Sequence, residues 1–195
     1  KRPVTLRADR NQVVNGVVGG VAVLVVDMQA TPVGLLGRAT DFAGELADAS
    51  GTLGMIGGQV LDVISEGRTP DVDCVRTIHR MKTAALIRAS VALGAIAARA
   101  DATVVSKISE FGQKIGLAFQ IIDDILDEEG DAATLGKTAG KDKAQQKMTY
   151  PACLGIDASR READELVREA LEAIAAIDTR GDLSAIARFI CTREH

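Results

Sequence analysis

Three carboxylates stand inside an apolar, helix-like run, Phe119-Gln120-Ile121-Ile122-Asp123-Asp124-Ile125-Leu126-Asp127. At 3.6 residues per turn, Asp123 and Asp127 lie one turn apart on the same helix face, with Asp124 beside them. Three anionic groups this close repel one another, and burying a charge without a partner is costly. The cluster therefore calls for a cation. Because oxygen ligands suit a hard ion, the run predicts a Mg²⁺ site that water and substrate phosphate complete.

A basic loop with regularly placed glycines follows the aspartates and reads Gly136-Lys137-Thr138-Ala139-Gly140-Lys141-Asp142. Lysines behind a carboxylate cluster can supply counter-charge to a diphosphate that metal bridges to the aspartates. The succession therefore favours a metal–diphosphate clamp over the simpler alternative, a solvated acidic helix end at residues 123–131. For Lys143 and Lys147, an ordinary exposed loop remains the better interpretation.

Further motifs extend this pattern along the chain in a fixed order. GLAFQIIDDILD (116–127), GDAATLGKTAGKD (130–142) and KMTYPACLG (147–155) are preceded by IHRMKTAALIRA (78–89) and GGQVLD (57–62). The set resembles the trans-isoprenyl diphosphate synthases, or polyprenyl synthetases, and is most similar to bacterial farnesyl and geranylgeranyl diphosphate synthases. The resemblance covers the chain from Asp41 to about Cys191.

The resemblance implies an all-α fold, a bundle of helices around a central cavity, as a single domain over residues 1–195 that lacks the family's N-terminal helices. It implies a prenyltransferase that condenses an allylic diphosphate with isopentenyl diphosphate through Mg²⁺-assisted ionisation, giving a short-chain prenyl diphosphate. A cytoplasmic homodimer is the form typical of this family. The helical periodicity between Thr40 and Ala187 independently favours the all-α fold.

Site residues follow from the motif matches. The resemblance implies Asp123, Asp124 and Asp127 as metal ligands, with Asp123, Asp124 and Lys82 in catalysis. It implies five contacts to the allylic diphosphate, namely Arg7, Lys82, Thr83, Gln120 and Lys137. Without the resemblance, Lys82 would be interpreted as a solvated lysine and Thr83 as a threonine bonded to its own helix.

The first aspartate-rich motif of the family has no counterpart in this sequence. A gap-free count back from Asp27 places Leu6-Arg7 on the family's Leu-Arg pair and Arg2-Pro3-Val4-Thr5 where aspartates are expected. With a short insertion, Lys1-Arg2 would be the arginine pair instead. A non-catalytic prenyl-diphosphate-binding or regulatory subunit is therefore the alternative function, and a prenyl-diphosphate-consuming lyase is a third. We expect the chain alone to make no prenyl product at a useful rate.

Composition limits the other classes of function. Apolar residues make up 47% of the 195 residues and charged residues 26%, which is typical of a globular protein. A net charge of -4 without a basic face argues against a nucleic-acid partner. Three widely spaced cysteines suggest free thiols in a reducing compartment. The uncharged segment Asn11–Val26 is too short for stable membrane insertion; we predict a buried helix there, with a strand as the competing interpretation.

Overall fold

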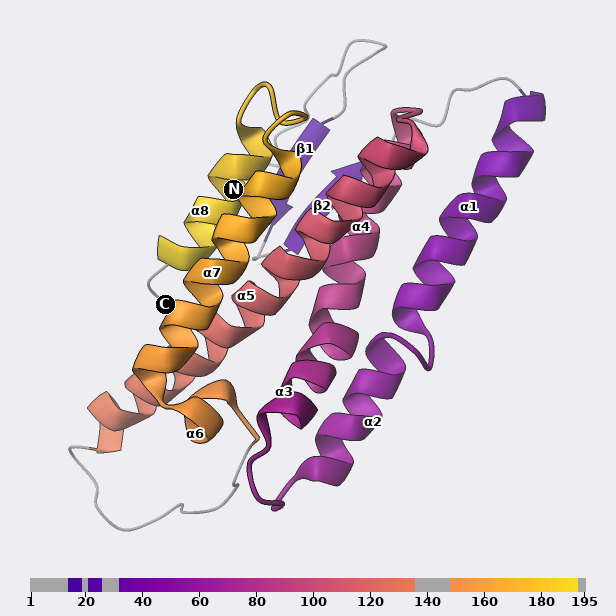
Figure 1. Ribbon diagram of the computed structural model, residues 1–195. Coiled ribbons are helices and arrows are strands. Elements are labelled where there is room, and N and C mark those ends of the chain that lie inside the picture. The colour runs from indigo at the N-terminus through magenta and orange to yellow at the C-terminus, as the bar shows by residue number, and fades with distance from the viewer. Residues whose placement is uncertain (1–13, 19–20, 26–31, 136–147, 193–195) are drawn as a thin grey trace, which may run out of the picture.

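The computed structural model describes residues 14–18, 21–25, 32–135 and 148–192, and within them helices form the body of the protein (Figure 1). Their order is α1 (Pro32–Ser50), α2 (Met55–Ser65), α3 (Val72–His79), the π-helical turn η1 (Arg80–Ala84), α4 (Ala85–Ala97), α5 (Ala102–Leu135), α6 (Tyr150–Leu154), α7 (Ile156–Ile174) and α8 (Asp182–Thr192). The all-α fold is confirmed for this bundle. Among the described residues, no helix is both long and apolar enough to cross a membrane.

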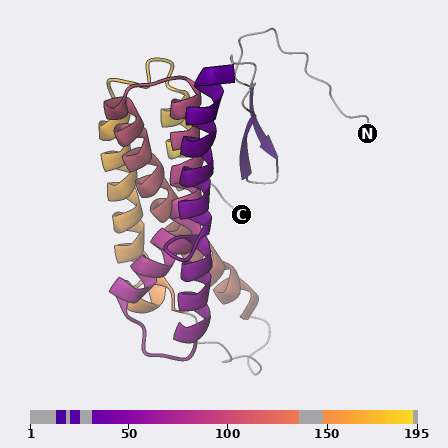
Figure 2. The same cartoon turned by 90° about the vertical axis from the view of Figure 1, so that its right-hand side faces the viewer.

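A valine-rich hairpin precedes the helices. Strands β1 (Val14–Val18) and β2 (Val21–Val25) pair antiparallel, with Val14 opposite Val25, and lie at the side of the bundle (Figure 2). The predicted buried helix at Asn11–Val26 is therefore wrong at these residues, and the competing strand interpretation is correct. The physical reason is that β-branched valine and glycine are poor helix formers, whereas valine packs well on a pleated surface.

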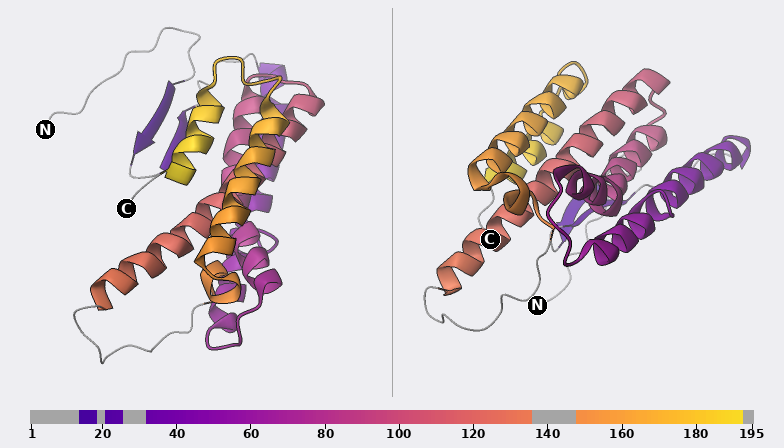
Figure 3. Two further views of the ribbon diagram at one scale, coloured as in Figure 1. Left: turned by 60° about the vertical axis from the view of Figure 1, so that its left-hand side comes forward. Right: turned by 60° about the horizontal axis from the view of Figure 1, so that its bottom comes forward.

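The longest helix, α5, organises the bundle because it packs most extensively against α7 on one side and α4 on the other. Its buried residues Phe111, Ile115, Ile121 and Ile125 recur at helical spacing and meet the inner face of α7. The C-terminal end of α5 projects beyond the neighbouring helices (Figure 3). Towards this end, exposed positions begin at Asp127, so α5 leaves the packed core there.

Two glycines allow close approach of the helices around η1. A Cβ built on Gly58 of α2 would lie 2.3 Å from the backbone nitrogen of Lys82, and one on Gly116 of α5 would lie 2.6 Å from Cα of Ala84. Neither contact could be relieved by rotating a side chain, so only glycine fits. The turn η1 is thus held between the α2 and α5 backbones.

Candidate functional site

The turn η1 presents Lys82 to an aspartate of α2. Lys82 Nζ lies 2.5 Å from Asp62 Oδ2, and the two side chains are 37% and 35% exposed. In η1 the N–H of Ala85 bonds to the carbonyl of Arg80, five residues back, which is the spacing of a π-helix. Such turns occur frequently at functional sites, because the extra residue changes which side chains face a neighbouring helix. Lys82 and Asp62 therefore form a half-exposed ion pair at the edge of the bundle.

A second contact joins η1 to α5. Thr83 Oγ1 donates a hydrogen bond of 2.8 Å to Gln120 Oε1. Gln120 in turn hydrogen-bonds the carboxylate of Asp124, one turn further along α5. Thr83 of one motif is thus connected to Gln120 and Asp124 of another in the folded chain.

Asp124 is the buried member of the aspartate cluster. The residue is only 8% exposed, and its Oδ2 accepts a 3.0 Å hydrogen bond from the backbone N–H of Tyr150. Burial raises the pKa of Asp124 to about 7, and the negative charges of Asp127 and Asp62 act in the same direction. The hydrogen bonds from Tyr150 and Gln120 oppose this shift because they favour the charged carboxylate.

His79 approaches the same carboxylate oxygen as Tyr150. Its Nε2 is 3.4 Å from Asp124 Oδ2, and its ring stacks on Tyr150 with the centroids 5.5 Å apart. Burial lowers the pKa of His79 to about 4; the charge of Asp62 opposes the shift and that of Lys82 reinforces it. Its Nδ1 is buried and has no hydrogen-bond partner among the described residues. His79 is therefore neutral near pH 7.

Asp123 and Asp127 differ from Asp124 in their surroundings: Asp123 is half-buried and Asp127 is exposed. Within the described ranges, no three His, Cys, Asp or Glu side chains are gathered so that they could hold a metal ion by themselves. Two carboxylates one turn apart still fit Mg²⁺ as part of its shell, since this ion usually keeps several waters and takes phosphate oxygens as further ligands. The donor chemistry therefore suits a magnesium–diphosphate complex rather than a bare ion.

The remaining predicted site residues, Arg7 and Lys137, lie outside the described residues. Conversely, Asp62 and His79 were not predicted as site residues, although both stand in motifs that the sequence displays. Asp62 ends the GGQVLD segment, four residues after the glycine at which α2 meets η1. His79 precedes Thr83 by four residues, which places the two side chains on one face of a regular helix.

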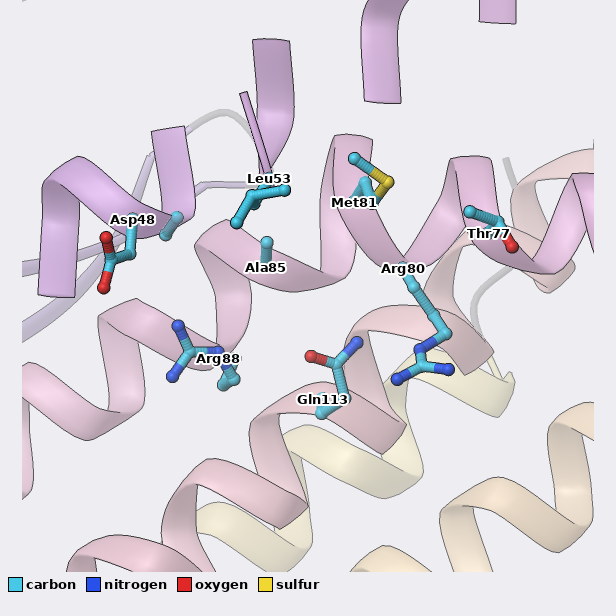
Figure 4. Close-up of a pocket in the computed structure, with 9 residues that line it drawn as sticks. Asp48, Leu53, Thr77, Arg80, Met81, Ala85, Arg88 and Gln113 are labelled. Atoms are coloured by element: carbon cyan, nitrogen blue, oxygen red, sulfur yellow. The ribbon is translucent and has the colours of Figure 1, made fainter. Parts of the chain in front are cut away.

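A separate cavity of about 400 Å³ is lined by residues of α1, α3, η1, α4 and α5 and of the turn that follows α1 (Figure 4). Arg80, Arg88 and Gln113 lie along one side of it, whereas Leu53 and Met81 lie along the other. None of the predicted site residues lines this cavity. It is therefore distinct from the Lys82–Asp62 region.

Comparison with known proteins identifies the family to which this chain belongs. The family model described as Polyprenyl synthetase matches residues 23–186. The chain therefore belongs to the polyprenyl synthetase family, as the motifs predict.

Particular relatives narrow the comparison. The chain is 46% identical over 155 residues to farnesyl diphosphate synthase of Escherichia coli (strain K12), which covers 76% of this chain and 52% of that protein. It is 45% identical over 161 residues to a chloroplastic geranylgeranyl pyrophosphate synthase of Catharanthus roseus, covering 81% and 45%. The chain thus spans about half the length of the curated relatives it matches.

Solved structures agree with this placement. An apo FPP/GFPP synthase from Zymomonas mobilis has a TM-score of 0.66 at 31% identity, covering 80% of this chain and 51% of its own. A geranyltransferase from Helicobacter pylori, complexed with magnesium and isoprenyl diphosphate, has a TM-score of 0.61 at 30% identity, covering 78% and 50%.

Proposed function

We propose that this protein is a prenyltransferase that condenses an allylic diphosphate with isopentenyl diphosphate to a short-chain prenyl diphosphate, with Mg²⁺ as cofactor. The observation that carries the proposal is the convergence at η1. There, the Lys82–Asp62 ion pair and the Thr83–Gln120 hydrogen bond adjoin the aspartate-bearing turn of α5. The names of the relatives, farnesyl and geranylgeranyl synthases, support the same reaction.

The roles of the residues follow from the charge that the reaction creates. Breaking the allylic C–O bond leaves the electron pair on the diphosphate, so negative charge grows there. When bound, Mg²⁺ supplies positive charge against this leaving group. Asp123 and Asp127 would hold the ion through carboxylate oxygens. Lys82 carries N–H donors beyond the one used on Asp62 and would direct them to phosphate oxygen.

Lys82 can exchange its partner Asp62 for a phosphate group. Ion pairs this exposed contribute only about 0–1 kcal/mol to stability. A diphosphate, with more charge than one carboxylate, can therefore take over Lys82 at small cost. Until then Asp62 keeps the ammonium group at the site. Thr83 and Gln120, with Arg7 and Lys137 outside the described residues, complete the proposed contacts to the allylic diphosphate.

A homodimer is the proposed assembly. Helices α1 and α2 and the turn between them expose large apolar side chains, among them Leu53 at 88% and Ile56, Val60 and Val63 at 51–54%. An apolar stretch of this kind typically marks a protein interface. A second copy of the chain would cover it. The free thiols of Cys74 and Cys153 support a reducing, cytoplasmic location as part of the proposal.

The test measures Mg²⁺-dependent binding of a non-hydrolysable allylic diphosphate analogue by calorimetry. Lys82→Met should weaken binding by at least about tenfold, because a charge-assisted bond to phosphate is lost. The matched control is Lys107→Met, which removes an exposed lysine near the N-terminal end of α5, far along that helix from the aspartates. Equal affinities in the two variants would remove Lys82 from the site.

A condensation assay with radiolabelled isopentenyl diphosphate then tests turnover directly. Binding without turnover is the result expected of these 195 residues alone, and a non-catalytic binding subunit predicts the same result. Turnover supports the transferase and refutes the expectation that a first aspartate-rich motif is indispensable.

A further inference from the structure

The short helix α6 depends on Asp124 for its start. Tyr150 is its first residue, and the first N–H groups of a helix have no partner within it. Thr149 caps one of them by accepting from Ala152 N at 3.3 Å, and Asp124 Oδ2 accepts the N–H of Tyr150 itself. A single turn such as α6 is not stable alone, so these outside contacts hold it in place.

The same tyrosine connects Asp124 to two more helices, α3 and α7. Its fully buried ring stacks on His79 of α3, and its hydroxyl accepts a 3.2 Å hydrogen bond from Arg76 Nε. Arg76 also donates to Glu162 of α7 at 3.1 Å. The carboxylate of Asp124 thus belongs to a network that joins α3, α5, α6 and α7.

We propose that Asp124 is a positioning residue: with His79 and Tyr150 it clamps α6 to α5 and thereby fixes the turn that presents Asp123 and Asp127, which alone hold the metal. The inference rests on the proposed function and assigns different roles within its aspartate cluster.

Accessibility distinguishes Asp124 from the other two aspartates. A hydrated Mg²⁺ ion needs room for a ligand distance of about 2.1 Å and for its retained waters. The carboxylate of Asp124 is already in contact with Tyr150, His79 and Gln120, and its side chain is only 10% exposed. Asp123 and Asp127 retain exposed surface.

The test compares four variants. Asp124→Asn keeps an oxygen that can accept the N–H of Tyr150 but removes the charge that a magnesium ligand needs, whereas Asp124→Ala removes both. Asp123→Asn is the ligand variant. Glu110→Gln, an equally charge-neutralising change at an exposed position of α5, is the control. The readouts are calorimetry with MgCl₂ and inorganic pyrophosphate, and hydrogen exchange of the peptide that contains α6.

We expect Asp123→Asn to weaken pyrophosphate binding at least about tenfold and Asp124→Asn less than about threefold, since only the former replaces a ligand. In Asp124→Ala, α6 should exchange about tenfold faster, while Asp124→Asn restores slow exchange. Equal loss of binding in the two asparagine variants, or unchanged exchange in Asp124→Ala, overturns the clamp. Absence of Mg²⁺-dependent binding in the unaltered protein counts instead against the proposed function, and the exchange comparison still decides the role of Asp124.

Discussion

Replacing Gly58 by alanine should both destabilise the protein and disturb its site. The added Cβ would lie 2.3 Å from the backbone nitrogen of Lys82 and 2.7 Å from its Cα, whereas ordinary contacts begin at 3.4 Å. The backbones of α2 and η1 must therefore separate by about 1 Å. Overpacking of this kind costs about 1–3 kcal/mol. The same movement would carry Asp62 away from Lys82.

Gly44 of α1 offers the matched control, because a Cβ built there meets nothing within 4 Å. Alanine at a helix position of this kind stabilises by about 0.5–1 kcal/mol relative to glycine. Urea unfolding followed by circular dichroism measures both variants. We expect Gly44→Ala to be as stable as the unaltered protein or more so, and Gly58→Ala to be less stable and to bind pyrophosphate more weakly. Equal stability of the two variants would refute the argument from close approach.

Three further perturbations test other parts of the structure. In the unaltered folded protein, Asp124 holds a proton between about pH 4 and 6.5 and His79 holds none. In the unfolded chain the histidine holds the proton instead. Because both states bind one proton, this pair of residues gives the stability no pH dependence in that range. In Asp124→Asn, the folded pKa of His79, about 4, lies below its unfolded value of 6.5; stability is then full above pH 6.5 and falls towards pH 4, by up to about 1.4 kcal/mol per pH unit. Urea unfolding at pH 7 and pH 5 measures this, and a flat profile would contradict it. Ile56→Glu with Val60→Glu should convert a dimer to monomer in sedimentation, and an unchanged mass would exclude this face as the interface. Phe111→Ala should lower the free energy of unfolding by about 3–5 kcal/mol, since its side chain is 2% exposed; a loss below 1 kcal/mol would contradict its place in the core.

The helical bundle could be predicted because its signal is local. Apolar residues at helical spacing specify α5 and α7 without reference to any partner. The meeting of Thr83 with Gln120 could also be expected, because both belong to motifs of one family. Asp62 could have been predicted from its motif as well. It follows Gly58 by four residues, so it lies on the same face of α2 as the glycine that contacts Lys82.

The hairpin shows where periodicity fails. An uncharged apolar run has no polar face, so its pattern cannot separate a buried helix from a strand. The residue types carry the missing information. Valines dominate both segments, and Gly19-Gly20 stands between them in the sequence, which is a hairpin signal. β-branching and glycine should therefore outweigh apolarity when an uncharged run of this length is interpreted.

The aspartate cluster shows a limit that no local pattern overcomes. At 100° per residue, Asp123, Asp124 and Asp127 share an arc of about 100°, so spacing alone treats them as equivalent ligands. What separates them is Tyr150, 26 residues further along the chain, whose N–H meets Asp124 and covers it. Tyr150 reaches Asp124 because α6 packs against α5, and this contact buries the carboxylate. Which aspartate is buried is therefore a property of the tertiary structure, and the sequence motif describes a set whose members the fold makes different.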